Sequence, residues 1–305
     1  MLNSKPLCPF RARSAANSLG VKDYIQLTKP RITWLIVMST AIGYYFGHQP
    51  GSPWSLWSIV HTLIGTGLIA SGTAALNQWY EREADRHMRR TRSRPLPAGR
   101  LQPYQAFWFA VFLSIAGGLE LGLCVNWLSS AIGILTLALY LGVYTPLKQK
   151  TWWSTTVGSI PGAMPPLIGY AAAAGHLTPG AWALAAILLI WQFPHFYAIA
   201  WMYREDYALA GIQMLPVVEP DGVSTSRQIL LYSVLLIPIS LLPSWLGMTG
   251  ALYTVGALAL GLFFLYTGIR VSLDRTRIRA RKVLLASVVY LPVLYGLMLI
   301  DPIRL

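Results

Sequence analysis

The chain has 305 residues, of which 55% are hydrophobic and 11% are charged, and its formal net charge is +13. A soluble domain of this length would carry about a quarter charged residues, so the composition excludes an ordinary soluble protein. The excess of positive charge does not indicate nucleic-acid binding here, because the basic residues lie at the edges of apolar segments.

Apolar runs of roughly 20 residues, the length that crosses a bilayer core, recur along the whole sequence. They predict an all-α integral membrane protein with about nine transmembrane helices. The predicted spans are 27–47, 57–79, 104–125, 128–145, 154–174, 180–202, 228–247, 250–269 and 283–300. We therefore expect an N-terminal tail at residues 1–23 and a single polytopic membrane domain at residues 24–302.

The positions of Lys and Arg predict the orientation. If the N-terminus is cytoplasmic, the inner segments hold 23 of the 24 Lys and Arg residues, and the outer segments hold only Arg304. This is the bias that orients membrane proteins. Tryptophans at the span ends fit interfacial belts, with Trp57, Trp182 and Trp245 outside and Trp152 inside.

The N-terminal tail has no apolar region of the kind found in a secretory signal. A plain cytoplasmic tail is the preferred interpretation, and an organelle transit peptide is the alternative. We expect a bacterial inner membrane rather than a mitochondrial one.

Seven of the 11 acidic residues lie in two short windows on the predicted inner side. In the first window, Asn77, Glu81 and Asp85 are spaced four apart, which places their oxygens on one face of a helix. Three such oxygens suit Mg²⁺, which takes its other ligands from water and substrate phosphates. Basic residues follow, among them Arg89 and Arg94. Acids, a metal and arginines together are typical of a diphosphate site.

An alternative interpretation gives the same window no catalytic or metal-binding role. The segment is then a solvated helix end with local ion pairs, Glu83 with Arg86 and Asp85 with Arg89. Spacing alone does not decide between the two interpretations.

The second window begins at Tyr203 and contains Glu205, Asp206 and Tyr207. It opens a connection of about 25 residues between two spans, and connections of that length are often functional. An ordinary polar loop is the alternative.

Single residues add weaker signals. Lys148 ends the fourth span and is either a point charge for a phosphate or a topological anchor. His195 lies within the sixth span, where an ionisable group is a functional candidate, although a packing histidine behind Pro194 is equally consistent. His61 is expected near the outer face, away from the acids. Cys8 and Cys124 fall on opposite sides, and their spacing is not typical of a metal site.

Together these segments resemble the UbiA superfamily of intramembrane prenyltransferases, and within it the branch that farnesylates haem. The resemblance covers residues 23 to 300. The segments that carry it are Asp23–Ile32, Ala75–Asp85, Arg89–Pro97, Tyr144–Lys148, His195–Phe196 and Tyr203–Pro216.

The resemblance implies a ring of nine helices around a central cavity, with two polar motifs at the cytoplasmic end that bind Mg²⁺ and an isoprenyl diphosphate. The first motif corresponds to Asn77, Glu81 and Asp85, with Glu where many members have Asp. The second is D-x₃-D in much of the superfamily, but its positions here are Tyr203 and Tyr207, and Asp206 is the nearest carboxylate. This departure matches the haem branch and leaves open whether the second motif binds metal.

The resemblance also implies that farnesyl diphosphate is the donor and that haem B is the acceptor, a substrate rather than a prosthetic group. Haem A synthase is the expected downstream partner. The catalytic residues are then expected to be Asn77, Glu81, Asp85, Lys148 and Asp206. Diphosphate is expected to contact Arg89, Arg94, Lys148, Tyr144 and Tyr203. His195 is the candidate haem-binding residue, and the metal ligands are Asn77, Glu81 and Asp85.

Three alternatives remain open at this stage. A sister prenyltransferase acting on a quinone precursor or chlorophyllide predicts an intact D-x₃-D motif, which is absent. A transporter predicts acids near the membrane midplane and internal repeats, neither of which is evident. A haem-binding assembly protein without turnover gives Asn77, Glu81 and Asp85 no role.

Overall fold

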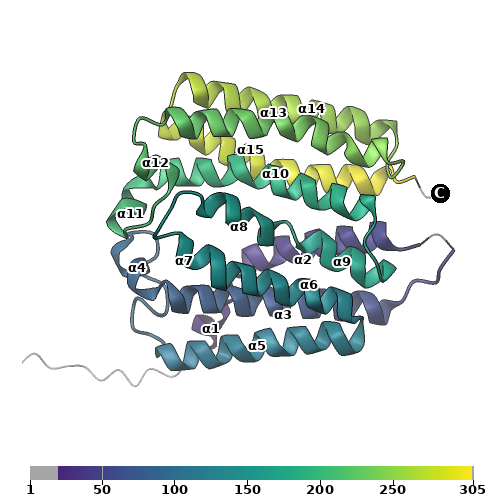
Figure 1. Cartoon of the computed structure of the whole chain (residues 1–305), viewed down its shortest axis with the longest axis horizontal. Coiled ribbons are helices and arrows are strands. Elements are labelled where there is room, and N and C mark those ends of the chain that lie inside the picture. Colours follow the sequence, from purple (N-terminus) through teal and green to yellow (C-terminus); the bar gives the residue numbers. More distant parts are fainter. Residues whose placement is uncertain (1–19, 50, 304–305) are drawn as a thin grey trace, which may run out of the picture.

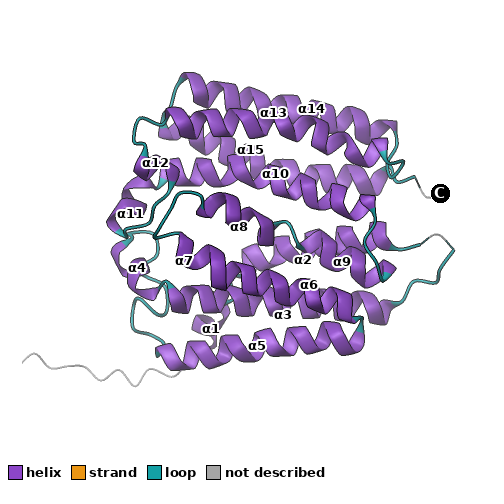
Figure 2. Cartoon of the chain, in the orientation of Figure 1, coloured by secondary structure: helices purple, strands orange, loops and turns teal. Residues whose placement is uncertain are grey.

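The computed structural model describes residues 20–49 and 51–303, and within them it contains helices and no β-strand (Figure 2). The predicted tail lies almost wholly outside the described residues, as do Cys8 and Arg304. The helices are α1 (Val21–Leu27), α2 (Pro30–Gly47), α3 (Leu56–Tyr80), α4 (Arg82–His87), α5 (Pro103–Cys124), α6 (Trp127–Ala138), the π-helix η1 (Leu139–Tyr144), α7 (Thr145–Leu147), α8 (Ser154–Gly162), α9 (Pro165–Ala174), α10 (Pro179–Met202), α11 (Arg204–Leu209), α12 (Leu215–Val218), α13 (Val223–Trp245), α14 (Ala251–Leu273) and α15 (Arg277–Ile300).

Seven helical segments in the described part of the chain are long and apolar enough to cross a membrane. They are α3, α5, the continuous run from α6 to α7, α10, α13, α14 and α15. The chain is therefore a multi-pass membrane protein. The other two predicted spans correspond to α2 and to the pair α8 and α9, which is interrupted around Ala163. The count of nine and the orientation of the N-terminus stay predictions.

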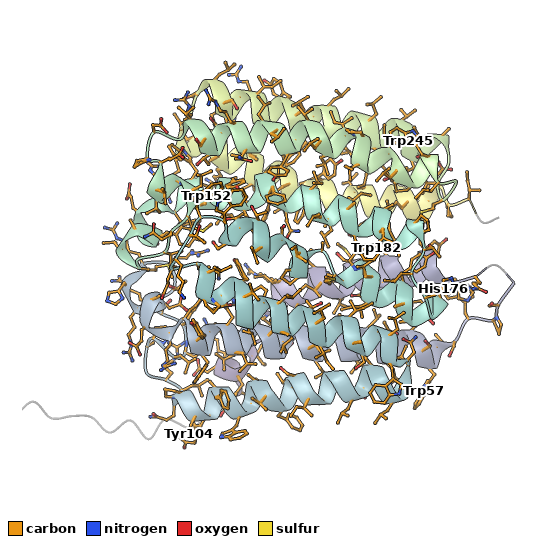
Figure 3. The ribbon with its side chains drawn as sticks, in the orientation of Figure 1. Trp57, Tyr104, Trp152, His176, Trp182 and Trp245 are labelled. Atoms are coloured by element: carbon orange, nitrogen blue, oxygen red, sulfur yellow. The ribbon has the colours of Figure 1, made fainter. Side chains whose placement is uncertain are left out.

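The long helices run side by side, and the short helices α4, α11 and α12 lie at one end of the bundle (Figure 1). We call this the α4 end, formed by residues 81–102, 148–153 and 203–222. The opposite end is formed by residues 48–49, 51–55, 125–126, 175–178 and 246–250. Trp57, Trp182 and Trp245 lie toward the opposite end and Trp152 toward the α4 end, as the belts predict (Figure 3).

The bundle consists of two groups of packed helices. In one, α3 packs against α5, and α2 packs against α3 and α9. In the other, α10, α13, α14 and α15 pack together, and α10 also contacts α8 and α9. Close approach of α3 and α5 depends on small residues, because a Cβ on Gly117 would lie 2.6 Å from the carbonyl oxygen of Gly65.

Candidate active site

The predicted row of Asn77, Glu81 and Asp85 lies at the α4 end, and its side chains are turned away from solvent. The three residues are 1%, 9% and 0% exposed. The helix is not continuous as predicted: α3 ends at Tyr80 and α4 begins after Glu81. The helical relation between the three residues is kept across this break. Glu81 N–H donates to the Asn77 carbonyl at 2.9 Å, and Asp85 N–H donates to the Glu81 carbonyl at 2.8 Å.

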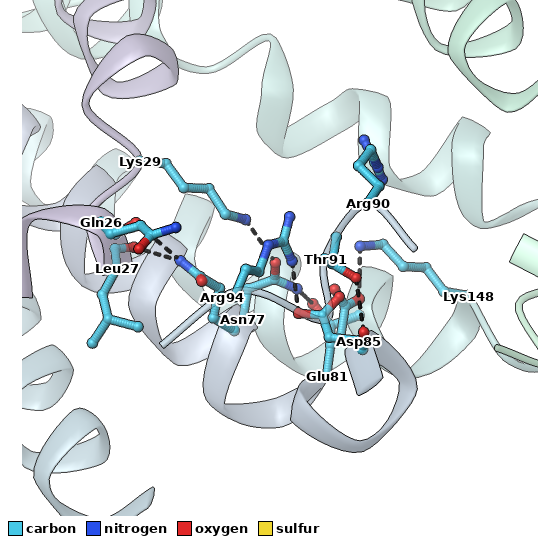
Figure 4. Close-up of polar contacts among 12 residues, drawn as sticks. Gln26, Leu27, Lys29, Asn77, Glu81, Asp85, Arg90, Thr91, Arg94 and Lys148 are labelled. Carbon is cyan, nitrogen blue, oxygen red and sulfur yellow. Dashed lines mark hydrogen bonds and ion pairs between the residues drawn. The ribbon is translucent and has the colours of Figure 1, made fainter. Parts of the chain in front are cut away.

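Three basic side chains meet this row, two of them from distant parts of the chain and one from the loop after α4 (Figure 4). Lys148 Nζ donates to Glu81 Oε1 at 2.7 Å. Arg94 donates to Asp85 Oδ2 at 2.7 Å, in place of the alternative Asp85–Arg89 pair. Lys29 Nζ donates to Asn77 Oδ1 at 3.1 Å. The solvated helix end is therefore wrong for this face, although the Glu83–Arg86 pair does form on the exposed face at 2.7 Å.

The charge states of these groups follow from burial and from each other. Burial opposes ionisation of Glu81, but Lys148 outweighs it and lowers the pKa of the carboxyl group. Burial likewise opposes protonation of Lys148, but Glu81 outweighs it and raises the lysine pKa. Glu81 and Lys148 are thus a charged pair. Lys29 has no such carboxylate bond, so burial, helped by Arg94, lowers its pKa to about 7.

The row fits a hard divalent cation. Asp85 Oδ2 is held by Arg94, but Asp85 Oδ1 is buried and has no hydrogen-bond partner. A buried carboxylate oxygen without a partner is costly unless a ligand completes it. With oxygens from Asn77 and Glu81 on the same row, the donor set is the one that Mg²⁺ prefers.

Aromatic rings line the site beside Lys148. Its Nζ lies 4.4 Å from the ring centre of Tyr144, which packs edge-on against Tyr140 at 4.9 Å. Both tyrosines belong to the π-helix η1, and such segments occur frequently at functional sites. Thr145, the next residue, accepts a bond from Asn77 Nδ2 at 3.4 Å, which ties η1 to the row.

The second window is joined to the first by Arg90. Its backbone N–H donates to Asp206 Oδ2 at 3.3 Å, and its guanidinium donates to the Tyr207 hydroxyl at 3.2 Å. The guanidinium also lies 4.9 Å from the ring centre of Tyr203. Arg89, by contrast, is exposed and makes none of these contacts. The structure therefore brings Arg90 and Arg94 to the two windows and leaves Arg89 outside.

His195 lies in α10 and faces α15. Its Nδ1 is 2.8 Å from Ser287 Oγ, and that hydroxyl donates its proton to the Leu284 carbonyl at 2.7 Å. Ser287 must therefore accept from His195 Nδ1–H, which leaves Nε2 with a free lone pair. Trp191 stacks on the ring at 5.0 Å. His195 precedes Tyr203 by eight residues, about 12 Å along a helix.

Lys29 and Arg90 were not among the residues predicted for the site. The available signal for Lys29 was its place directly before Pro30 at the start of a span. It is the one non-glycine residue in the described chain with positive φ, at 49°. The ring of a proline disfavours helical dihedral angles at the residue before it. The backbone of Lys29, whose side chain contacts Asn77, is therefore strained.

Comparisons with known proteins identify the family of this chain. The model of the UbiA prenyltransferase family matches residues 36–290. The chain belongs to the UbiA prenyltransferase family. Family membership confirms the predicted fold class and makes the chain a prenyltransferase.

Two curated relatives carry the same name. The protoheme IX farnesyltransferase of Solibacter usitatus is 66% identical, and the alignment covers 92% of this chain and 99% of the relative. The protoheme IX farnesyltransferase of Koribacter versatilis is 46% identical, with 92% and 93% covered.

Solved structures share the fold at low identity. Digeranylgeranylglyceryl phosphate synthase superposes with a TM-score of 0.76 at 18% identity, covering 93% of this chain and 99% of that one. A UbiA homolog from Archaeoglobus fulgidus bound to GPP and Mg²⁺ gives 0.65 at 16% identity, with 90% and 99% covered.

Proposed function

We propose that this prenyltransferase moves a farnesyl group from farnesyl diphosphate to the C2 vinyl group of haem B. The product is haem O, with a hydroxyethylfarnesyl side chain, on the route to haem A. The observation that carries the proposal is the buried row of Asn77, Glu81 and Asp85 with three cations around it. The name shared by relatives at 66% and 46% identity supports the choice of donor and acceptor.

The first requirement is to bind a diphosphate beside the membrane. Asn77, Glu81 and Asp85 would hold Mg²⁺, which when bound offsets the negative charge that grows on the leaving group. Lys29, Arg94 and Lys148 already point at this row, and their ammonium and guanidinium groups would donate to diphosphate oxygens. Charges fixed in a buried site act without reorganisation, which is the main source of such stabilisation.

The second requirement is to shelter the allylic carbon. The bond between farnesyl C1 and the diphosphate oxygen breaks, and its electron pair leaves with the diphosphate. The rings of Tyr140 and Tyr144, next to Lys148, offer aromatic faces to the developing allylic cation. The vinyl group of haem supplies the electron pair for the new carbon–carbon bond. Water then adds to the resulting carbocation beside the pyrrole and loses a proton.

The third requirement is to orient the acceptor. His195 Nε2 carries the free lone pair, so we assign it as an axial ligand to the haem iron during binding. Ser287 would fix the tautomer, as outer hydrogen bonds do for metal-bound histidines.

The second window acts by hydrogen bonds rather than by binding a metal in this proposal. Asp206 Oδ2 already accepts from the backbone of Arg90, and Tyr203 and Tyr207 surround its guanidinium. These contacts would hold the segment that carries Arg94 over the diphosphate. With the N-terminus inside, the reaction takes place at the cytoplasmic face of a bacterial inner membrane, where haem A synthase would take the product.

The experiment is mass spectrometry of haems from bacterial cells that lack their own haem O activity. Cells with the wild-type chain should contain haem O, and Glu81→Ala and Asp85→Ala should abolish it while the protein still inserts. Glu83→Gln is the matched control, because Glu83 lies between them but on the exposed face. Normal haem O in both alanine variants would contradict the proposal. A prenylated quinone precursor in place of haem O would favour the sister enzyme.

A further inference from the structure

The opposite end of the bundle contains a group of ligating side chains that the proposed reaction does not use. These are His61 of α3 with Glu120 and Cys124 of α5. One ligating atom from each lies within 4.8 Å of the other two. His61 is 16 residues from Asn77 on α3, so the two groups are about 24 Å apart along the helix.

The helix pair that carries these residues is a rigid scaffold. Glu120 and Cys124 are four residues apart and share one face of α5. Next to them, Gly65 and Gly117 bring the backbones of α3 and α5 close together. The His61 ring is further held by Trp57, whose ring centre lies 3.8 Å away. The ligands therefore sit on regular helices rather than on loops, which favours a defined geometry.

The charge around this group is unusual for the chain. A carboxylate within a membrane-spanning helix is expensive unless it is paired. The connecting segments at this end, residues 48–55, 125–126, 175–178 and 246–250, contain no Lys or Arg. Glu120 Oε1 instead meets His61 Nδ1 at 2.5 Å, and the two side chains remain 25% and 18% exposed. Among the described residues, the carboxylate is thus paired with a ligating imidazole rather than with Lys or Arg.

We propose that His61, Glu120 and Cys124 form a binding site for a zinc-type divalent cation, with water as the fourth ligand. Nitrogen, oxygen and sulfur together suit Zn²⁺, whereas Mg²⁺ and Ca²⁺ take oxygen ligands. Bond lengths of about 2.0 to 2.3 Å around a tetrahedral ion place ligand atoms roughly 3.4 to 3.8 Å apart. The ion would separate the His61 and Glu120 atoms by about 1 Å and draw Cys124 in by a similar amount, within the reach of side-chain rotation.

The first test measures retained metal. Full-length protein with Cys8→Ser is purified in detergent, loaded with Zn²⁺, desalted into Mg²⁺ buffer and analysed by mass spectrometry of metals. Zinc retention should fall roughly tenfold or more in His61→Gln and Glu120→Gln. His176→Gln is the matched control, because His176 lies at the same end and its Nδ1 contacts the Ala174 carbonyl rather than another ligating side chain. Equal retention in the four proteins would overturn the site. Prenyl transfer, whose site is distant, should be unchanged in all of them and reports that each is folded.

The second test follows the Cys124 thiol itself. In the Cys8→Ser protein, alkylation of Cys124 by a maleimide should be slowed by Zn²⁺, unaffected by Mg²⁺ and restored by a chelator. Loading with Co²⁺ should give a thiolate charge-transfer band that Cys124→Ser abolishes. If Zn²⁺ does not change the rate of alkylation and the band is absent, the proposal is overturned, whatever zinc retention the variants show.

Discussion

The two acidic windows at the α4 end differ in burial and in what their acids contact. In the first, Glu81 and Asp85 are nearly inaccessible and each meets the side chain of a cation, Lys148 on Glu81 and Arg94 on Asp85. In the second, Asp206 is half-buried and accepts a backbone N–H. The first window therefore holds buried charges, whereas the second window positions the loop after α4, which carries Arg90 and Arg94. Substitutions in the two windows should therefore differ in size and kind.

The largest effect is expected at Asp85. Asp85→Ala removes the buried carboxylate whose Oδ1 lacks a partner and leaves Arg94 without its anion. Prenyl transfer should fall at least about a hundredfold, as it does when one group that stabilises developing charge is lost. Product formation in washed membranes measures it, normalised to inserted protein. If Asp85→Ala were as active as Glu83→Gln, the buried face of this segment would have no special role compared with its exposed face.

Next in size is Lys29, where charge and backbone strain can be separated. Both Lys29→Gln and Lys29→Gly remove the ammonium group, so both should raise KM for farnesyl diphosphate roughly tenfold to a hundredfold. Only glycine relieves the positive φ, so Lys29→Gly should be about 1 kcal/mol more stable than Lys29→Gln. Steady-state kinetics and thermal unfolding in detergent provide the two measurements. An unchanged KM would exclude Lys29 from the diphosphate site.

A smaller effect is expected at the junction of the windows. Arg90→Ala loses the contacts with Tyr203 and Tyr207, but these are exposed interactions, so transfer should fall only about threefold to tenfold. Asp206→Asn keeps an oxygen acceptor for the Arg90 N–H, so prenyl transfer should fall less in this variant than in Arg90→Ala. Kinetics of the single variants and of the double variant should show that their effects are not additive. A loss as large as that of Asp85→Ala would mean that the second window also binds the metal.

The smallest effect is expected at Arg89. It is exposed, and Arg89→Ala should leave transfer and stability unchanged. Parallel assays with Arg94→Ala supply the contrast, because Arg94 bonds the buried Asp85. If the two variants lost activity equally, the site would differ from the one described.

What the sequence could predict was local. Periodic apolar runs indicated the helices, and the four-residue spacing indicated a shared face for Asn77, Glu81 and Asp85. The partners were not predictable in this way, since Lys29 is 48 residues from Asn77 and Lys148 is 67 residues from Glu81. The choice between Arg89, Arg90 and Arg94 likewise depends on how the loop after α4 turns. The contact between His61 and Glu120 was not predictable either, because the two residues lie 59 residues apart on two helices.

The most direct measurement uses the purified wild-type chain in detergent with farnesyl diphosphate, haem B and Mg²⁺. Mass spectrometry of the haem product should show the mass of haem B increased by one farnesyl group and one hydroxyl group. A chelator should abolish this product, and added Mg²⁺ should restore it. Haem B that stays unmodified under these conditions, while the same preparation prenylates a quinone precursor, would contradict the proposed function.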